Sequence, residues 1–443
     1  MHRQRVASPV VLFATLSLAR AATGQLSPQD RERQVNSYIT GLQSASTVAS
    51  DVQGNFVVVW QSVGSFAGDS SLLSIQAQRY DSLGRKAGTQ LQVNTYTTNA
   101  QQRPRVGMDA GGNFVVVWES DGSSLGDTSG RSILGQRVAA NGAPLGAEFQ
   151  VNTYTSLNQY YAGVGVAPDG SFLVVWASNG SPGNDSNSTS IQARLYDSTG
   201  SPLGDQFQVN NFTTGFQELP VVAAAGTGDF IVAWKHNGAG IGDGLSVQAR
   251  QVAASGTPVG VQFQVNSATP GTQTAPAVAA DGAGNFAVVW QSLPGGAETE
   301  IEAAVFDAFG VPVLGEFQVN SYSTQNQAEP SVAMSPQGDF VVAWESYGSA
   351  GGDTSLDSVH ARRYDADGSA RGVEFQANTY TTNNQILPAV ATDGSGNFVI
   401  VWESDGSFDD DHSDKSVQQR RFDALFRDGF ESGTTVRWSA TVP

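Results

Sequence analysis

Residues 114–118 read Phe-Val-Val-Val-Trp, and this pattern returns throughout the 443-residue chain. Residues 56–60 repeat it letter for letter, and the other copies read FLVVW, FIVAW, FAVVW, FVVAW and FVIVW. The tryptophans that end these runs are spaced by 58, 58, 58, 56, 54 and 58 residues: Trp60, Trp118, Trp176, Trp234, Trp290, Trp344 and Trp402. A fixed period of this length is the signature of a repeat architecture.

Each copy of the repeat is expected to form four short strands. In the second copy these are Arg103–Met108, the FVVVWES segment, SILGQRVA and Glu148–Asn152. The turn at Asp109–Asn113 and the later segment ANGAPLG carry the Gly and Asn residues that are typical of hairpin connections. The second strand does not alternate apolar with polar residues, so both of its faces need to be covered.

Four-stranded sheets stacked face to face around an axis cover both faces of such a strand, as in a β-propeller. Copy seven has a third strand near Ser416–Phe422 but no EFQVN after it, whereas Gln34-Val35-Asn36 stands alone before copy one. An N-terminal strand that completes the last sheet would leave no open edge. The sequence therefore predicts an all-β, seven-bladed β-propeller over residues 34–424, in preference to a solenoid or a string of small sandwiches.

The two ends of the chain fall outside the repeat. Residues 1–21 combine a basic head (Arg3 and Arg5), an apolar stretch of about 14 residues and the small-x-small pattern of Ala19-Arg20-Ala21, which together indicate a signal peptide. This stretch is too short for a membrane span, which needs about 20 apolar residues. We expect a secreted or cell-surface protein, with residues 22–33 as an N-terminal linker and 425–443 as a tail that carries a DGFESG motif.

The composition excludes several classes of function. The chain has 41 acidic and 23 basic residues, a formal charge of −18 and no cysteine. Nucleic acid is not an expected partner, because phosphate binding needs clustered Lys and Arg residues. Without cysteine there are no disulfides, thiolate zinc sites, iron–sulfur clusters or cysteine nucleophiles.

Polar residues recur between the fourth strand of one copy and the first strand of the next. An Asn closes each EFQVN-like motif, a Gln follows seven residues later, and an aromatic residue usually stands between them. The amides could bond to backbone groups of the loop, and the rings could wedge between adjacent sheets. The same tyrosines could instead form part of a binding face: Tyr38, Tyr96, Tyr154, Tyr322 and Tyr380.

Aspartate recurs nine residues after the tryptophan. Propeller connectivity places these loops at the same end as the tyrosine loops, which predicts a negatively charged binding face that includes Asp69, Asp127, Asp185, Asp243, Asp353 and Asp411. Oxygen ligands in Gly-rich loops suit calcium, but Asp and Gly are also ordinary turn formers. The best calcium candidate is the crowded loop of copy seven, with Asp405, Asp409, Asp410, Asp411 and Asp414.

Little in the sequence indicates catalysis. His236, His360 and His412 have no metal-ligand spacing, and no nucleophile elbow is present. Two acids from different copies could still form a glycoside hydrolase pair. No acid of the expected first strands stands out from the repeat. Glutamates that directly follow the tryptophan are expected to face solvent at a strand end: Glu119, Glu345 and Glu403.

The repeat resembles tandem repeats of large secreted bacterial proteins of uncharacterised role. Asp109–Ser120, Gln78–Gly84 and Glu148–Thr155 carry this resemblance, in the form DxxGNFVVVWxS, QRYDxxG and EFQVNTYT. The architecture is also similar to the integrin α-subunit propeller, although the FG-GAP signature and a complete DxDxDG loop are missing. The resemblance therefore implies no ligand residues.

Taken together, these patterns predict an exported, non-enzymatic propeller that uses one loop face for binding or adhesion. Its expected partner is an extracellular glycan or protein, with calcium as the candidate cofactor. Two alternatives remain open, a polysaccharide-acting hydrolase with carboxylates from different blades and a structural spacer.

Overall fold

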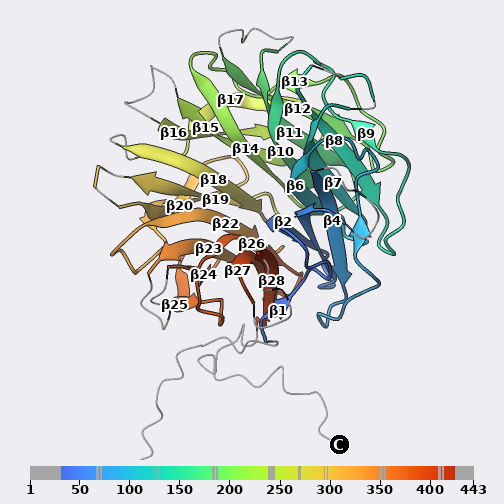
Figure 1. Ribbon diagram of the computed structural model, residues 1–443. Helices are drawn as coiled ribbons and strands as arrows, with labels where there is room; N and C mark the ends of the chain where they lie inside the picture. Colours follow the sequence, from blue (N-terminus) through green and yellow to red (C-terminus); the bar gives the residue numbers. More distant parts are fainter. Residues whose placement is uncertain are drawn as a thin grey trace, which may run out of the picture.

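The computed structural model describes residues 31–424, except 66–68, 70–71, 124, 128, 182–184, 186–187, 238–244, 268–270, 294, 297, 349–352, 354–355, 408–410 and 412–413. Within these ranges the chain is all-β and propeller-like, as predicted, with its strands in successive antiparallel sheets (Figure 1). The predicted signal peptide 1–21, most of the linker and the tail 425–443 lie outside the described residues.

Each repeat supplies a run of consecutive strands. The first copies give β2 (Gln43–Ser50), β3 (Phe56–Val63), β4 (Leu73–Tyr80), β5 (Leu91–Gln92), β6 (Gln101–Met108), β7 (Phe114–Asp121), β8 (Arg131–Val138), β9 (Phe149–Gln150), β10 (Gln159–Val166), β11 (Phe172–Asn179), β12 (Thr189–Tyr196) and β13 (Phe207–Gln208). The middle copies give β14 (Phe216–Ala224), β15 (Phe230–Asn237), β16 (Leu245–Val252), β17 (Pro258–Gln264), β18 (Thr272–Ala280), β19 (Phe286–Leu293), β20 (Glu300–Phe306) and β21 (Pro312–Gln318). The last copies give β22 (Gln327–Met334), β23 (Phe340–Tyr347), β24 (Asp357–Tyr364), β25 (Ala370–Gln376), β26 (Gln385–Thr392), β27 (Phe398–Asp405) and β28 (Lys415–Phe422), and β1 (Arg33–Gln34) precedes the repeat.

Consecutive strands of a copy pair antiparallel in chain order, so β2-β3-β4-β5, β6-β7-β8-β9 and β22-β23-β24-β25 form separate sheets. The three copies from β10 to β21 are joined only by single parallel pairs, Thr189 with Phe216 and Leu245 with Thr272. The last sheet has the order β1-β28-β27-β26. The N-terminal strand thus pairs with the final copy, as the missing EFQVN motif predicted.

The first strand of each copy lies innermost and contacts the first strands of the neighbouring copies. These contacts run from β2 through β6, β10, β14, β18 and β22 to β26, and β26 in turn contacts β2. A buried cluster joins the two ends of the repeat, with Val35, Val401 and Val417 on one side and Phe56 and Trp60 on the other. The sheets therefore surround a common centre (Figure 1).

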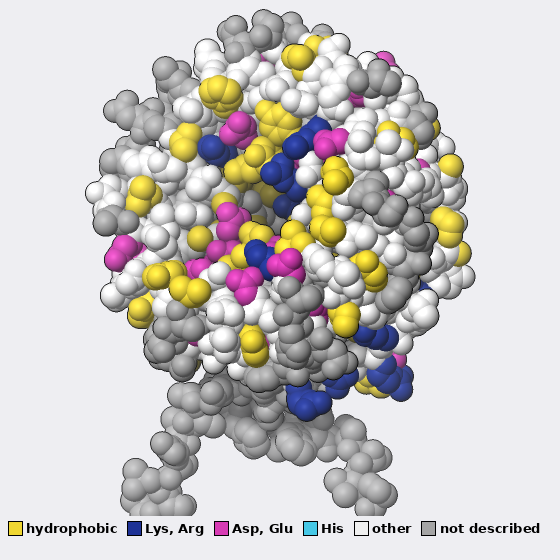
Figure 2. Space-filling model, viewed as in Figure 1, with side chains coloured by type: hydrophobic (Ala, Val, Ile, Leu, Met, Phe, Trp, Pro, Cys, Tyr) yellow, Lys and Arg dark blue, Asp and Glu magenta, His cyan; other side chains and the backbone are white. Residues whose placement is uncertain are grey.

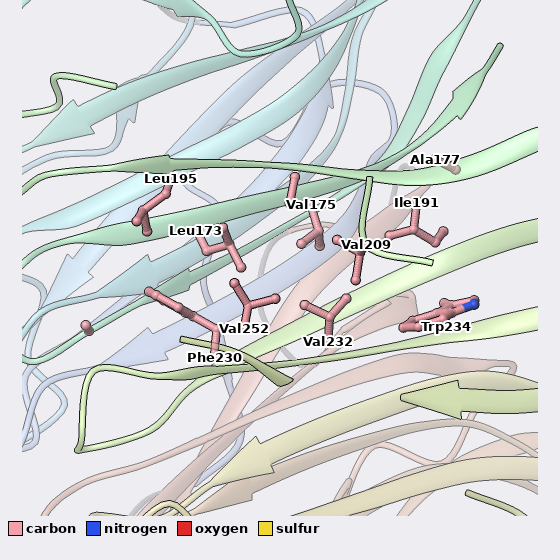
Figure 3. Close-up of a cluster of buried hydrophobic side chains, with 12 residues drawn as sticks. Leu173, Val175, Ala177, Ile191, Leu195, Val209, Phe230, Val232, Trp234 and Val252 are labelled. Carbon is pink, nitrogen blue, oxygen red and sulfur yellow. The ribbon is translucent and has the colours of Figure 1, made fainter. Parts of the chain in front are cut away.

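The hydrophobic core is divided into layers between neighbouring sheets. In Figure 3 Leu173 and Val175 face Phe230, Val232 and Trp234 across one such layer. Each FVVVW strand buries both of its faces, because alternate side chains enter the layers on its two sides. This arrangement is the reason why the second strand is apolar without alternation.

Every repeat tryptophan is fully buried and donates its indole N–H to a glutamine of the same copy. The Nε1–Oε1 distances are 2.9–3.2 Å, and the glutamine always stands 17 residues before the tryptophan. The acceptors are Gln43, Gln101, Gln159, Gln217, Gln273, Gln327 and Gln385. The recurring glutamine is thus part of the scaffold, because it satisfies a donor that has no access to water.

A second repeated contact links each sheet to the next. A side chain from the outer strand of one copy accepts the backbone N–H groups that follow the recurring Asn of the preceding copy; Glu148, for example, accepts from Thr95 and Tyr96. The residues in this position are Gln90, Glu148, Gln206, Gln262, Glu316, Glu374 and Glu32. The last contact corrects the predicted linker boundary at residue 33, since Glu32 already bonds to Thr379.

Removal of one indole acceptor should destabilise the fold. Gln101→Leu leaves the Nε1–H of Trp118 buried without a partner, which should cost about 1–3 kcal/mol and lower the melting temperature in calorimetry. Gln53→Leu, at an exposed turn position, is the matched control and should leave the melting temperature unchanged. Equal melting temperatures for Gln101→Leu and the wild type would contradict this role.

Candidate functional site

The innermost strands share a bulge close to their first residues. Two residues after the recurring glutamine the backbone enters the left-handed region, with φ between 47° and 55°, and the ladder register shifts there. The residues in this conformation are Ala45, Arg103, Tyr161, Leu219, Ala275, Glu329 and Leu387. None is glycine, so each bulge carries strain that the surrounding sheets must hold in place.

In four copies the bulge N–H is bonded by the residue that follows the tryptophan of the preceding copy. Glu119 accepts from Tyr161 at 2.8 Å, and Glu403 accepts from Ala45 at 2.6 Å. Gln61 and Glu345 make the same contact to Arg103 and Leu387. The expectation that these glutamates face solvent is wrong for Glu119 and Glu403, which are buried because the bulge of the next copy covers their strand ends, whereas Glu345 is half-buried.

Positions around the bulge vary from copy to copy, whereas the scaffold positions do not. The bulge residue itself is basic, aromatic or acidic in Arg103, Tyr161 and Glu329. Two residues later the copies carry Thr47, Arg105, Gly163, Val221, Ala277, Ser331 and Ala389. Arg105 is therefore a long charged side chain at a position that is otherwise small or aliphatic.

These variable positions lie where the innermost strands approach the centre of the ring. Figure 2 shows a hollow there, with basic side chains gathered on the side of β6 and β10 and acidic ones on the side of β22 and β26. At the opposite end of the innermost strands, neighbouring turns bond directly to one another, Gly226 to Asp281, Gly282 to Pro336 and Gly394 to Val52. The innermost strands thus surround a hollow at one end, which we call the channel mouth, and their turns are in direct contact at the other end.

The basic side of the mouth is built around a buried glutamate. The carboxylate of Glu119 is fully buried and pairs with Arg103 at 3.3 Å and with Arg131 at 3.1 Å. Arg131 also pairs with Asp121 at 3.0 Å. The guanidinium of Arg103 lies 5.1 Å from the centre of the Tyr161 ring, which is a cation–π distance.

Two tyrosines extend this side into the third copy. The rings of Tyr160 and Tyr161 meet edge to face with centroids 5.0 Å apart, and the Tyr160 hydroxyl bonds to Asn179 at 3.1 Å. Burial raises the pKa of Tyr160 to about 12, so its hydroxyl stays protonated at neutral pH. The mouth therefore offers aromatic faces beside guanidinium groups.

The acidic side of the mouth contains Glu329 and Glu345. Burial, reinforced by Glu329, Asp357 and Glu403, raises the pKa of Glu345 to about 8. Burial also raises the pKa of Glu329, although its side chain is open to solvent in the channel. At neutral pH Glu345 is mostly a neutral acid that can donate a hydrogen bond.

Each glutamate that follows a tryptophan has a charged residue near it at the start of the neighbouring third strand, and the sign of that charge differs between copies. Arg131, Lys415 and Asp357 occupy equivalent register positions at the start of β8, β28 and β24. Glu119 and Glu403 consequently have a cationic partner, with Lys415 at 3.2 Å from Glu403. Glu345 instead faces the acid Asp357.

The recurring aspartates do not form the exposed acidic surface that was expected. Those that the structure describes are buried and accept a hydrogen bond from the recurring Asn at 3.0–3.3 Å: Asp69, Asp127, Asp185, Asp353 and Asp411. The Oδ1 atom of the same Asn accepts a backbone N–H near the start of the third strand. In the first copy, for example, Asn94 accepts from Ile75 of β4. Asp243 lies outside the described residues.

The recurring tyrosines pack onto the loop that follows the second strand. A Cβ atom added to Gly64 would lie 2.7 Å from the Tyr38 hydroxyl, and Gly122, Gly180, Gly348 and Gly406 lie against their tyrosines in the same way. These glycines have positive φ angles. Tyr38, Tyr96, Tyr154, Tyr322 and Tyr380 are only partly exposed and shape the loop end around the mouth.

The described aspartates of the predicted calcium site each have different surroundings. Asp411 bonds to Asn36, Asp405 accepts from Asn384 at 2.9 Å, and Asp414 is exposed. Asp409 and Asp410 lie outside the described residues. No group of three potential metal ligands occurs in the described part of the chain, and calcium binding stays a prediction.

Sequence reasoning missed Arg105, Tyr161 and Glu329 as candidate site residues. The signal that could have found them is the deviation of single copies from the repeat at positions two and four residues after the recurring glutamine. Among the described residues, we also find no helix suited to crossing a membrane.

Comparisons with known proteins support the fold. No protein-family model and no curated protein matches the sequence. Among solved structures, the chain is similar to an ulvan lyase bound to -[GlcA(1-4)Rha3S]-, with a TM-score of 0.52 and 9% identity over 87% of this chain and 95% of that one. It is also similar to the polysaccharide lyase Uly1, with a TM-score of 0.50 and 8% identity over 88% and 91% of the two chains. For an α-L-arabinanase of Penicillium chrysogenum, the TM-score is 0.47 and the sequence identity is 15%, over 71% of this chain and 92% of that one.

The raised pKa of Glu345 predicts a loss of stability as the pH rises from about 4.5 to about 8. The folded group binds its proton up to pH about 8, against an ordinary value of 4.5, so the folded protein holds more protons over this window and becomes less stable as the pH rises through it. Glu345→Gln should flatten this slope in calorimetric melting curves. Asp357→Lys should also reduce it, by supplying the cation that Glu119 and Glu403 have. Identical slopes in wild type and Glu345→Gln would contradict the assignment.

Proposed function

We propose that the chain is an exported, seven-bladed propeller closed by its N-terminal strand, and that it binds an extracellular glycan at the mouth of its central channel. The observation that carries this proposal is the location of the irregular residues. Charged and aromatic side chains that break the repeat gather at one end of the channel, in Arg103, Tyr161 and Glu329.

The side chains at this mouth suit sugar recognition. Flat aromatic rings contact the apolar faces of a sugar, and paired charged groups supply both donors and acceptors for its hydroxyls. Tyr160 and Tyr161 provide the rings, and Arg103, Glu329 and Glu345 provide the polar atoms. The fold similarity to polysaccharide lyases supports a glycan as the partner.

Binding at the mouth differs from the adhesion surface that the loop sequences suggested. The recurring aspartates are taken up by the scaffold, so an exposed acidic face for a cationic partner has little to support it. A glycan end that enters the hollow would instead touch residues from several copies at once. The recurring tyrosine loops would then form the rim around that ligand.

A second candidate function is cleavage of the bound polysaccharide. It is favoured by the neutral form of Glu345 beside Glu329, because a protonated carboxyl next to a second carboxyl is the pairing that glycoside hydrolysis uses. In this case Glu345 would give its proton to the glycosidic oxygen as its bond to the anomeric carbon breaks, and the ionised Glu329 would take a proton from the water that adds to that carbon. Release of reducing ends by the wild type, lost in Glu345→Gln, would distinguish cleavage from binding.

A glycan array followed by calorimetric titration tests the proposed site. For a glycan that binds the wild type, Tyr161→Ala should weaken binding by about five- to hundred-fold, because a lost stacking contact on an aromatic ring costs roughly 1–3 kcal/mol. Phe309→Ala removes an aromatic side chain that is 87% exposed in a turn at the other end of the sheets, and should leave the affinity unchanged.

Two results would contradict the proposal. One is an array without any glycan ligand, which would favour the spacer hypothesis. The other is a glycan whose affinity is insensitive to Tyr161→Ala, since the ligand would then bind elsewhere on the molecule.

A further inference from the structure

Arg105 is the side chain of the channel that the scaffold explains least. It lies on β6, two residues after the bulge, where the other copies place only small or aliphatic side chains. Two of them place alanine there, Ala277 and Ala389. The fold therefore does not require an arginine at this position, and its presence needs another reason.

Most of the N–H donors of the Arg105 guanidinium make no hydrogen bond within the described residues. Its hydrogen bond within the described residues runs from Nη1 to the carbonyl of Pro104, at 3.0 Å. A guanidinium has five N–H donors, so this one contact leaves most of them directed elsewhere. The side chain is open to solvent, and in the described part of the chain it forms no ion pair.

The channel also makes this charge costly. The innermost strands that surround the channel partly desolvate the guanidinium and lower the pKa of Arg105, although the side chain is still exposed, while Glu119 and Glu329 act in the opposite direction. Glu119 is already committed to Arg103 and Arg131. Glu329 also acts on Arg105, but the two form no ion pair in the described part of the chain. An anion that enters the channel from solvent could therefore approach the guanidinium more closely than either glutamate does.

The other side chains of the mouth indicate the kind of molecule that could bring this anion. Tyr161 presents its ring beside Arg103, and Glu345 is mostly neutral at physiological pH. A sugar ring could lie against the tyrosine while a charged substituent reaches the deeper guanidinium. An arginine fork matches the planar carboxylate and the sulfate group better than a lysine would.

We propose that Arg105 binds the anionic group of an acidic sugar, a carboxylate or a sulfate, at the glycan site of the channel mouth. This inference rests on the proposed glycan-binding function and names its ligand class. The net charge of −18 does not prevent it, because charges farther away than about 8 Å are screened at physiological salt. Arg105 would then be a specificity-determining residue.

The experiment uses matched pairs of charged and neutral ligands. Calorimetric titration of the protein compares tetragalacturonate with its methyl ester, and a sulfated galactan tetrasaccharide with its desulfated form. We expect at least one charged ligand to bind, and the paired neutral form to bind about ten- to hundred-fold more weakly, the range for a charge-assisted hydrogen bond. The pair that responds identifies carboxylate or sulfate as the source.

Three variants locate the effect. Arg105→Ala should reduce the affinity for the charged ligand to that of its neutral form, and it should fold normally because alanine occupies this position in two copies. Arg105→Lys should give an intermediate affinity, since it keeps the charge and loses the fork. Arg85→Ala, which removes an arginine from an exposed turn at the other end of the sheets, should have no effect.

The outcomes separate this inference from the function on which it rests. Equal binding of charged and neutral ligands, or an Arg105→Ala variant that binds the charged ligand as tightly as the wild type, overturns the role of Arg105 while glycan binding stands. Failure of every glycan to bind, on the array and in titration, overturns the proposed function and the inference with it.

Discussion

The buried indole N–H of the repeat tryptophan is the constraint on which the rest of the structure depends. Water cannot reach it, and a donor left unpaired there would cost about 1–3 kcal/mol in each copy. The glutamine that accepts it begins the innermost strand, and its own amide donates to the loop before that strand, as Gln101 does to Thr98. Each glutamine side chain therefore connects the tryptophan in the second strand of its sheet to the innermost strand, and also to the loop that comes from the preceding sheet.

This tie also explains why the channel mouth can vary. The bulge that follows the glutamine lies at the start of the innermost strand, and its residue is not part of the fully buried layers, although Tyr161 packs against the edge of one of them. The bulge N–H finds an acceptor from the preceding copy, such as Glu119 or Gln61, so the backbone is held without help from its own side chain. Side chains at the bulge are consequently free to differ, and the copies differ there in charge, size and aromaticity.

The architecture could be predicted from the sequence, but the candidate site could not, and both outcomes have physical reasons. Two-sided apolar strands demand sheets on both sides, and the isolated motif around Val35 leaves one partner for the unfinished last sheet. Burial of Asp127 depends on Asn152, which stands 25 residues later and reaches it only when the third and fourth strands pair. The approach of Arg105 to Glu329 joins copies two and six, a proximity that no local spacing encodes. The interpretation of the repeated Asn and Gln as scaffold is confirmed, whereas the tryptophan partner of the Gln and the aspartate partner of the Asn were overlooked.

In a repeat scaffold, the same residue type at one repeat position acquires different properties when its neighbours differ between copies. Glu119, Glu345 and Glu403 stand at one repeat position and bond to equivalent bulges, yet each meets a different partner. Arg131 and Lys415 balance two of these carboxylates, whereas Asp357 opposes the third and favours its protonated form. Single substitutions in an otherwise constant frame therefore give copy two its basic residues and copy six its acids, and Arg105 and Glu329 interact between these two copies. An asymmetric ligand can be oriented by such a mouth, because its two sides offer different chemistry.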